Sequence, residues 1–417
     1  MHAELLTIGS ELMSGATVNG NAAYLARRLT ELGLACWRQV AVGDERGPLL
    51  AALRDGLHRS EVLLVTGGLG PTFDDITMEA IAEATGRPLR PRPAVAAMIR
   101  RFYTQHHRPL QRAALRQARI PEGGLPLPNP IGTAPGLWLP LAGRLLIALP
   151  GVPSEMQAIM EQSVIPRLRR LPGLGIVATR TLRTVGVVEL QIERFIRRLR
   201  VPDTVRLGLY PHLRAVDIRL TAIGTSRRQA QKDVGGIEAP LRRSLGAAVY
   251  GTDDETLEGV VGALLIRRRK TLAVAESCTG GLVTDRLTNV PGSSRYLRGG
   301  LVAYHNDVKR GCLGVPATQL ARYGAVSAPV ARAMAQGIRR MAGADLGLAV
   351  TGIAGPTGGT PRKPVGLVYL GLADGRGAKS LRCQFFGDRT SVKIQAAQTA
   401  LDWLRRYLLE SPIVHRP

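Results

Sequence analysis

Aromatic residues make up only 4% of the 417-residue sequence. Proteins that bind single strands without sequence preference stack bases on aromatic side chains, so this scarcity argues against such a platform. No apolar run reaches the roughly 18 residues that a membrane-spanning helix needs. The first eight residues have neither the basic region nor the apolar length of an export signal. We therefore expect a cytoplasmic protein with no membrane partner.

Cysteine is also scarce, with four residues at positions 36, 278, 312 and 383. They lie far apart and match neither the CxxC spacing nor a zinc-ligand spacing. The sequence therefore predicts no disulfide framework and no zinc site, and we interpret the cysteines as buried, reduced thiols.

Acidic residues are fewer than basic ones. The sequence has 32 Asp and Glu and 56 Lys and Arg, which gives a net charge of +24. Such a charge attracts phosphates and nucleic acids alike. The basic residues are scattered, with one compact run at 267–270, and we interpret most of them as solvated helix faces. Because no helix-turn-helix signal is found and residues 179–250 contain no GxxG loop, direct nucleic-acid binding is not expected. A nucleic-acid or recombination-protein partner is the alternative.

The length predicts two or three domains. Up to about residue 168, short apolar runs alternate with amphipathic stretches, a pattern typical of an α/β domain with a mostly parallel sheet. The expected strands and helices are 4–8, 21–32, 40–42, 49–58, 62–65, 145–149 and 154–162. Proline and glycine at 171–175 then indicate a linker.

The remaining chain predicts two further units. Residues 179–250 combine alternating β patterns at 206–209 and 216–223 with a helix at 189–199, which indicates a small α+β module. From Leu257 a second α/β unit begins, with a strand at 272–275, a glycine-rich turn and a closing helix at 392–408.

Two glycine-rich turns could bind phosphate. The first, 66–75 (TGGLGPTFDD), follows an apolar strand and precedes a helix, so its backbone N–H groups can approach an anion. Asp74 and Asp75 could hold Mg²⁺ beside phosphate oxygens, or they could cap the following helix. The turn is neither a Walker A loop nor a GxGxxG fingerprint.

The second turn, 276–281 (ESCTGG), repeats this arrangement and is expected to seat another phosphate. Ser294, Tyr304 and Lys309 follow it. They supply a hydroxyl, a phenol and an amine, which is the inventory of a serine hydrolase with a lysine base. Ordinary surface residues are the alternative interpretation.

Several motifs together resemble the CinA family. Residues 275–282, 290–294, 349–356 and 387–389 resemble its C-terminal domain, which is similar in activity to nicotinamide-nucleotide amidases, and 9–12, 67–75 and 149–156 resemble its molybdopterin-binding-like domain. The resemblance implies an α/β protein with a three-layer α/β/α domain at 1–170, a KH-like α+β domain at 171–252 and an α/β amidase domain at 256–412. It also implies a homodimer.

For the C-terminal domain, the resemblance implies hydrolysis of nicotinamide mononucleotide to nicotinic acid mononucleotide and ammonia, without a cofactor. Ser294 matches the nucleophile and Lys309 the base, with Ser277 as the reserve nucleophile. Tyr304 matches a third catalytic hydroxyl. The other implied residues are Thr351 at the reaction centre and the substrate-binding Ser277, Thr279, Gly280, Gly281 and Arg389.

For the N-terminal domain, the resemblance implies ADP-ribose pyrophosphatase activity. It would depend on Mg²⁺, Mn²⁺ or Co²⁺ at Asp74 and Asp75, with K⁺ as an additional ion. The implied nucleotide contacts are Asn19, Gly67, Gly68, Gly70 and Thr72. The sequence departs from the family at Gly20, where a hydroxyl is missing. The alternative function is a nucleotide-binding regulatory or competence protein in which one or both sites are not catalytic.

Overall fold

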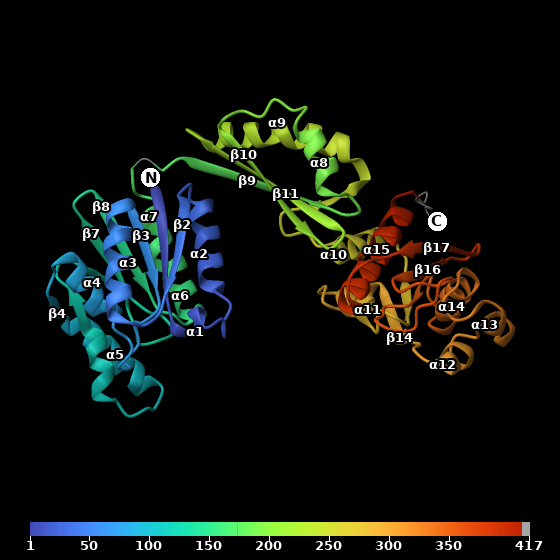
Figure 1. Ribbon diagram of the computed structural model, residues 1–417, viewed down its shortest axis with the longest axis horizontal. Coiled ribbons are helices and arrows are strands. Elements are labelled where there is room, and N and C mark those ends of the chain that lie inside the picture. The colour runs from blue at the N-terminus through green and yellow to red at the C-terminus, as the bar shows by residue number, and fades with distance from the viewer. Residues whose placement is uncertain (173, 411–417) are drawn as a thin grey trace. The chain divides into compact units, whose positions relative to one another are not determined.

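The computed structural model describes residues 1–172 and 174–410 (Figure 1). The chain divides into two compact units. One contains Met1–Ala178 and Ile223–Gln231, and the other contains Thr179–Ala222 and the chain from Lys232 onward. Gly173 of the predicted linker and residues 411–412 of the predicted third domain lie outside the described residues.

The N-terminal domain is built on a six-stranded sheet of order β2-β1-β3-β8-β7-β6. The strands are β1 (His2–Ile8), β2 (Ala35–Val42), β3 (Val62–Thr66), β6 (Leu125–Leu127), β7 (Gly136–Leu141) and β8 (Arg144–Leu149). The first four strands in this order run parallel to one another. Strand β7 pairs antiparallel with both of its neighbours, β8 and β6. The predicted strand at 40–42 is the end of a longer β2.

Helices cover both faces of this sheet, which confirms the three-layer prediction. Leu5 and Leu64 pack in a core with α2 (Gly20–Glu31), α6 (Pro153–Ile159) and α7 (Ile165–Leu168). Leu6 and Leu63 point to the opposite core, because side chains alternate along a strand. That core contains α3 (Arg46–Arg59) and α4 (Thr77–Thr85).

The same domain has small elements that the sequence patterns did not predict. They are α1 (Ser10–Met13), β4 (Leu89–Pro91), α5 (Pro93–Gln105), a 3₁₀ helix (Arg112–Ala118) and β5 (Arg119–Pro121). Strand β4 pairs with β5, and α5 packs on the 3₁₀ helix through Val95, Ile99 and Ala114.

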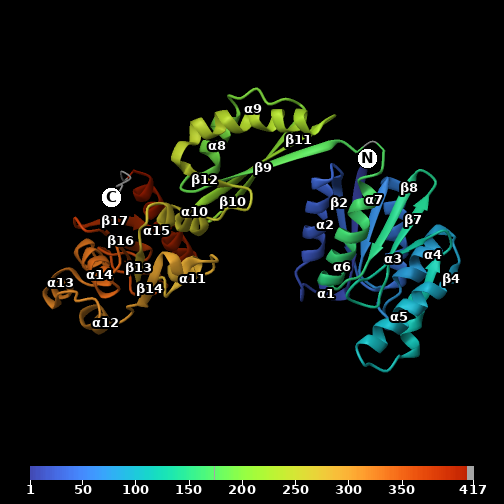
Figure 2. The ribbon, with the colours of Figure 1, turned by 180° about the vertical axis from the view of Figure 1, so that it is seen from behind.

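The middle segment is α+β, as predicted. Its sheet has the order β10-β11-β9-β12, and α8 and α9 lie on the same face of it (Figures 1 and 2). The elements are β9 (Ile176–Thr184), α8 (Glu189–Ile196), β10 (Val205–His212), β11 (Ala215–Gly224), α9 (Arg227–Leu245) and β12 (Val249–Thr252).

The C-terminal domain has a mixed sheet of order β14-β13-β15-β16-β17. Its strands are β13 (Leu272–Glu276), β14 (Leu297–Val302), β15 (Leu346–Gly352), β16 (Leu367–Ala373) and β17 (Ala378–Gln384). Strands β14, β13 and β15 are parallel neighbours.

Two groups of helices cover this sheet. Helices α10 (Leu257–Arg267), α11 (Leu282–Thr288) and α15 (Arg389–Glu410) share a core with Val274 and Val350. Helices α12 (Asn306–Gly311), α13 (Ala317–Tyr323) and α14 (Ala328–Met341) pack on the opposite face, with Ala273 and Ala275.

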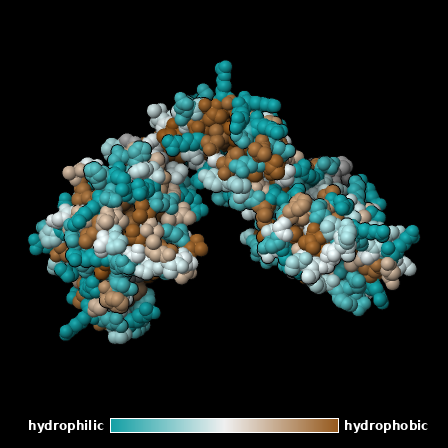
Figure 3. Space-filling view, in the orientation of Figure 1, coloured by the Kyte–Doolittle hydropathy of each residue, from teal (hydrophilic) through white to brown (hydrophobic). Residues whose placement is uncertain are grey.

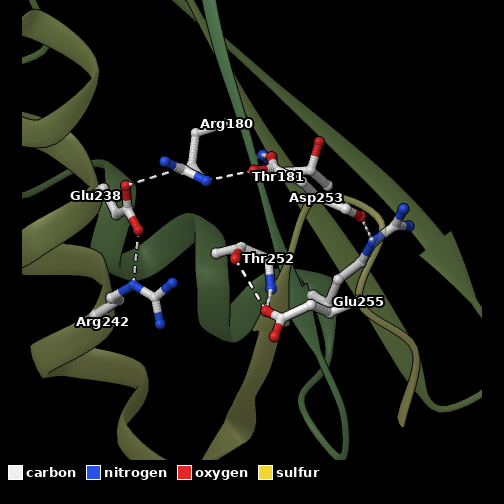
Figure 4. Close-up of polar contacts among 8 residues, drawn as sticks. Arg180, Thr181, Glu238, Arg242, Thr252, Asp253 and Glu255 are labelled. Carbon is white, nitrogen blue, oxygen red and sulfur yellow. Dashed lines mark hydrogen bonds and ion pairs between the residues drawn. The ribbon is translucent and has the colours of Figure 1, made fainter. Parts of the chain in front are cut away.

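An ion-pair network fixes the chain where it leaves the middle sheet for α10 (Figure 4). Asp253 has a left-handed backbone with a φ of 51°. Its carboxylate accepts a 2.9 Å hydrogen bond from the Thr181 amide and pairs with Arg180, which also lies 3.2 Å from Glu238. The Glu255 carboxylate closes the turn by accepting from the Thr252 amide at 2.7 Å.

The face seen in Figure 3 is largely hydrophilic, with apolar residues among the hydrophilic ones. Among the most exposed apolar side chains are Val188 and Leu190, just before and within α8. All four cysteines are free thiols, as predicted, but only Cys278 is buried, and the prediction of a buried thiol is wrong for the exposed Cys312. Among the described residues, no helix is both long enough and apolar enough to cross a membrane.

Candidate functional site

Three parallel strands of the C-terminal domain end at one edge of the sheet. The Glu276 carbonyl accepts from the Ala303 amide at 2.7 Å, and the Ser277 amide donates to the Val350 carbonyl at 2.9 Å. Tyr304 lies two residues after the end of β14, and Thr351 lies near the end of β15. Ligands of open α/β sheets bind outside the carboxyl ends of the strands, and this edge therefore forms the candidate site.

Lys309 is the buried base candidate at this edge. It lies on α12, is only 1% exposed, and donates from Nζ to the Tyr304 carbonyl at 2.9 Å. Within the described part of the chain it has no carboxylate partner. Burial lowers its pKa, because the apolar surroundings disfavour the charged amine, and this effect outweighs the opposing influence of Cys278. Lys309 is therefore suited to accept a proton.

Ser277 directly follows β13, at the strand edge where Lys309 contacts the Tyr304 carbonyl. Val274 faces the core of α10, α11 and α15, whereas Ala275 faces the core of α12 and α14. Glu276 turns back to α11, so the alternation directs Ser277 to the side of α12. The Ser277 side chain is 8% exposed, and its Oγ makes no hydrogen bond within the described residues.

Ser294 lies at the other end of β14. It belongs to a short 3₁₀ helix, Ser293–Arg295. The residue after this helix is Tyr296, whose carbonyl accepts a hydrogen bond from the Leu272 amide at 2.8 Å. The six-residue strand between Ser294 and Tyr304 is about 16 Å long at 3.3 Å per residue. Within one chain, the structure therefore does not bring Ser294 together with Lys309.

Arg389 and Tyr304 form the rim of the site. The Arg389 guanidinium donates to the Tyr304 hydroxyl and to the Gly355 carbonyl, each at 2.8 Å. Tyr304 is 60% exposed, whereas Thr351 is fully buried. The Thr351 hydroxyl donates to the Ala325 carbonyl at 2.9 Å, so its single proton is already used in the loop before α14.

The glycine-rich turn at 276–281 differs from the predicted phosphate seat. The fully buried Glu276 carboxylate accepts from the amides of Gly281, Val283 and Thr284 at 3.1, 3.0 and 2.8 Å. These are the N–H groups that the helix start was predicted to offer to phosphate. That part of the prediction is wrong, because Glu276 already occupies them. A carboxylate at the end of the buried strand, six residues before the helix start at Leu282, was the overlooked signal.

The first glycine-rich turn has its own backbone requirements. Gly67 has a φ of 113°, and a Cβ there would lie 2.2 Å from the Ile8 carbonyl oxygen. Gly68 has a φ of 63°, and the Thr77 hydroxyl binds the Gly67 carbonyl at 2.9 Å. Only glycine suits these positions, so close packing alone accounts for them. Their predicted nucleotide contacts remain predictions.

Thr72, Asp74 and Asp75 form a polar cluster after Gly70. The Thr72 hydroxyl lies 2.5 Å from a carboxylate oxygen of each Asp, and the Thr72 amide donates to Asp75 at 2.9 Å. This hydrogen bonding lowers the pKa of Asp74. Neither Asp caps α4, whose N-cap is Ile76, so the capping interpretation is wrong.

This cluster fits a hard cation. One hydroxyl proton cannot serve two carboxylates, and two carboxylate oxygens beside a hydroxyl are oxygen ligands of the kind that Mg²⁺ takes together with phosphate. No group of three or more Asp, Glu, His or Cys suited to a metal occurs in the described residues. Substrate oxygens and water would have to complete the coordination.

Asn19 caps α2 rather than standing free. Its side-chain oxygen accepts from the Ala22 amide at 3.1 Å, and its amide donates to Thr7 at 2.9 Å. The neighbouring Asn21 reaches the Gly151 carbonyl at 2.7 Å and so ties α2 to the turn after β8. The predicted nucleotide contact of Asn19 remains a prediction.

Comparison with known proteins places the whole chain in one group. It is 44% identical over 418 residues to the "CinA-like protein" of Gloeobacter violaceus, which covers 99% of this chain and 95% of that protein. It is 44% identical over 411 residues to the "CinA-like protein" of Salinibacter ruber, covering 98% and 100%. The chain belongs to the CinA family.

Family models agree with this membership. The "Probable molybdopterin binding domain" matches residues 4–170, the "Damage-inducible protein CinA KH domain" matches 179–251 and the "CinA C-terminal domain" matches 254–408. A solved CinA structure of unknown function from Thermoplasma acidophilum is 38% identical, covers 40% of this chain and 97% of its own, and has a TM-score of 0.38. A Klebsiella pneumoniae CinA superfamily structure is 34% identical, covers 37% and 97%, and has a TM-score of 0.36.

Proposed function

We propose that the C-terminal domain hydrolyses the carboxamide of nicotinamide mononucleotide, giving nicotinic acid mononucleotide and ammonia. The supporting observation is the buried Lys309, whose pKa is lowered and which lies at the strand edge that also carries Ser277. A lowered pKa increases the neutral fraction of the amine, and a neutral amine can activate a serine hydroxyl for acyl transfer. The substrate is the one that the family resemblance implies.

In the first step, the Ser277 oxygen attacks the carboxamide carbon while its proton passes to the Lys309 amine. The amides of Cys278 and Thr279 are the candidate donors to the developing oxyanion, because they make no hydrogen bond within the described residues. Lys309 then returns the proton to the departing nitrogen. The C–N bond breaks, ammonia leaves, and an ester on Ser277 remains.

In the second step, water replaces ammonia. Lys309 accepts a proton from the water as its oxygen attacks the ester carbon, and the proton returns to Ser277 as the C–O bond breaks. Nicotinic acid mononucleotide is released and the serine is restored. Arg389 and Tyr304 lie at the rim, where they can orient the substrate.

Ammonia release from nicotinamide mononucleotide tests this proposal. We expect turnover by the unchanged protein and by Ser294→Ala, with loss of at least about 1,000-fold in Ser277→Ala and Lys309→Met. Loss in Ser294→Ala with retention in Ser277→Ala would return the nucleophile to Ser294, in a site built from two chains. If no form turned over, the nucleotide-binding regulatory alternative would lead.

We propose a second activity for the N-terminal domain. This activity is the metal-dependent hydrolysis of the pyrophosphate bond of ADP-ribose. Thr72, Asp74 and Asp75 support it, because their oxygens converge at the end of a glycine-rich turn. Mg²⁺, Mn²⁺ or Co²⁺ bound there would neutralise pyrophosphate charge and polarise a phosphorus–oxygen bond. The same proposal includes K⁺ as an additional ion and the turn glycines as nucleotide contacts.

Metal binding and turnover can be measured separately here. Mn²⁺ titration should show one site in the presence of ADP-ribose, and Asp74→Asn and Asp75→Asn should each weaken it at least about tenfold. ADP-ribose hydrolysis should fall in parallel. Unchanged binding and turnover in both variants would refute the assignment.

We also propose that the protein is a cytoplasmic homodimer, as the family resemblance implies. Sedimentation equilibrium at micromolar concentration would show twice the chain mass of 44.7 kDa. A single-chain mass throughout would exclude a dimer, and with it any site in which Ser294 comes from a second copy.

A further inference from the structure

A mononucleotide substrate brings a phosphate, and the C-terminal domain needs a group that recognises it. The start of α11 does not provide one, because Glu276 holds the amides of Gly281, Val283 and Thr284. The buried carboxylate also cancels the positive potential that a helix start would otherwise offer to an anion. The phosphate must therefore be bound by another group near this turn.

Lys393 lies over the same turn. A Cβ built on Gly280 would be 3.7 Å from the Lys393 Nζ, and no other atom of the described residues comes within 4 Å of that position. The space above Gly280 is therefore open except for one ammonium group. Gly280 has a φ of 65°, which turns its backbone toward this space without a side chain to fill it.

The direction of α15 connects Lys393 with the rest of the site. Lys393 is four residues after Arg389, so both side chains leave the same face of the helix. The Arg389 guanidinium reaches the Tyr304 hydroxyl at the rim. Among the described residues, Lys393 makes no ion pair and no hydrogen bond, and its charge is free for a ligand.

A hydroxyl in the same turn also lacks a partner. Thr279 is fully buried, and its Oγ1 makes no hydrogen bond within the described residues. Buried hydroxyls nearly always have a partner, so an unsatisfied one in a ligand-binding turn indicates a missing acceptor. A small shift of the turn on binding would let this hydroxyl donate to a phosphate oxygen.

We propose that Lys393, together with the turn at Thr279 and Gly280, binds the phosphate monoester of the mononucleotide substrate. This inference rests on the proposed amidase function, and it makes Lys393 a determinant of specificity for nucleotides over nucleosides. A lysine suits this role because its ammonium is a compact charge with three donors.

Paired substrates test the proposal. Amide hydrolysis is measured for nicotinamide mononucleotide and for nicotinamide riboside, which lacks the phosphate. In Lys393→Met, the ratio of kcat/KM for the nucleotide to that for the riboside should fall about 10- to 100-fold, mainly through KM, because one charge-assisted contact is lost. Lys393→Arg should keep most of the ratio.

Lys379→Met is the matched control, because Lys379 is an exposed lysine on β17 whose side chain makes no hydrogen bond or ion pair within the described residues. Its ratio should equal that of the unchanged protein. An equal loss on both substrates in Lys393→Met, or no loss on either, would overturn the proposal.

A binding measurement separates this inference from the proposed function. If no form hydrolyses either substrate, the amidase proposal fails, and calorimetric titration still reports affinity for each compound. Selective weakening of nicotinamide mononucleotide in Lys393→Met would then support the phosphate site alone. Equal affinities of both proteins for the nucleotide would refute it.

Discussion

The two glycine-rich turns have the same sequence pattern but use their carboxylates in opposite ways. In the N-terminal turn, Asp74 and Asp75 remain on the surface beside the Thr72 hydroxyl, and neither caps α4. In the C-terminal turn, the Glu276 carboxylate is completely buried and holds the start of α11. The first turn therefore presents its negative charge to solvent, whereas the second uses its charge to build the loop.

This difference follows from where each carboxylate stands in the chain. Glu276 is the last residue of a fully buried strand, so its side chain cannot reach water and must be satisfied by nearby N–H groups. Asp74 and Asp75 follow the turn and precede α4, so solvent reaches them. A carboxylate thus stabilises the C-terminal domain, whereas two carboxylates of the N-terminal domain remain available for chemistry.

The largest expected effect is on folding. Glu276→Ala leaves the amides of Gly281, Val283 and Thr284 and the Thr284 hydroxyl without their acceptor, and we expect a loss of about 3–5 kcal/mol in unfolding free energy. Asp74→Asn, the matched change in the exposed turn, should cost less than about 0.5 kcal/mol. Urea unfolding followed by circular dichroism measures both. Similar losses in the two variants would break the comparison.

The glycines of the two turns should also differ. Gly67→Ala places a Cβ against the Ile8 carbonyl at a left-handed φ, and we expect a cost of about 2–4 kcal/mol. Gly280→Ala meets only the Lys393 ammonium at ordinary contact distance, so about 1 kcal/mol of backbone strain is expected. The same unfolding experiment ranks them. The reverse order would show that the space above Gly280 is filled.

The sequence predicted the layers of both α/β domains but not the use of individual side chains. Apolar runs such as those ending at Val65 and Ala275 predicted their strands, because a buried strand needs a continuous apolar segment. The hydrogen bonds that the Glu276 carboxylate accepts leave no pattern in the sequence from which they could be predicted. Capping of α4 by Asp74 or Asp75 was one of two interpretations of their place before the helix, and it is absent, because the helix starts at Thr77.

Strand direction explains the outcome for Ser294. Motif order places Ser294 and Lys309 close in sequence, yet the apolar residues between them form β14. A strand separates its two ends by its full length, so only residues after β14 share the edge with Ser277. Reading 297–302 as a strand would have shown this from the sequence.

The buried Lys309 should make the stability of the protein depend on pH. Because burial lowers its pKa, the unfolded chain binds more protons than the folded chain between that pKa and the ordinary value of 10.5. Stability should therefore rise with pH in that window, and kcat/KM should rise through the pKa of Lys309. In Lys309→Met, the stability increase should disappear, and unfolding at pH 7 should change by no more than about 1 kcal/mol. A decrease in stability over that window in the unchanged protein would contradict a buried, unpaired amine.

Two threonines differ in a similar way. Thr72 is exposed within the cluster of the proposed metal site, whereas the buried Thr351 gives its proton to the Ala325 carbonyl. Thr351→Val leaves that carbonyl unsatisfied, so we expect about 1–2 kcal/mol lower stability and a kcat reduced less than about tenfold. An oxyanion donor would instead show a kcat loss of about 100-fold or more. Steady-state rates beside unfolding curves decide between these roles, and Thr351→Ser, which keeps the hydroxyl, should restore most of the stability if Thr351 acts by holding the loop before α14.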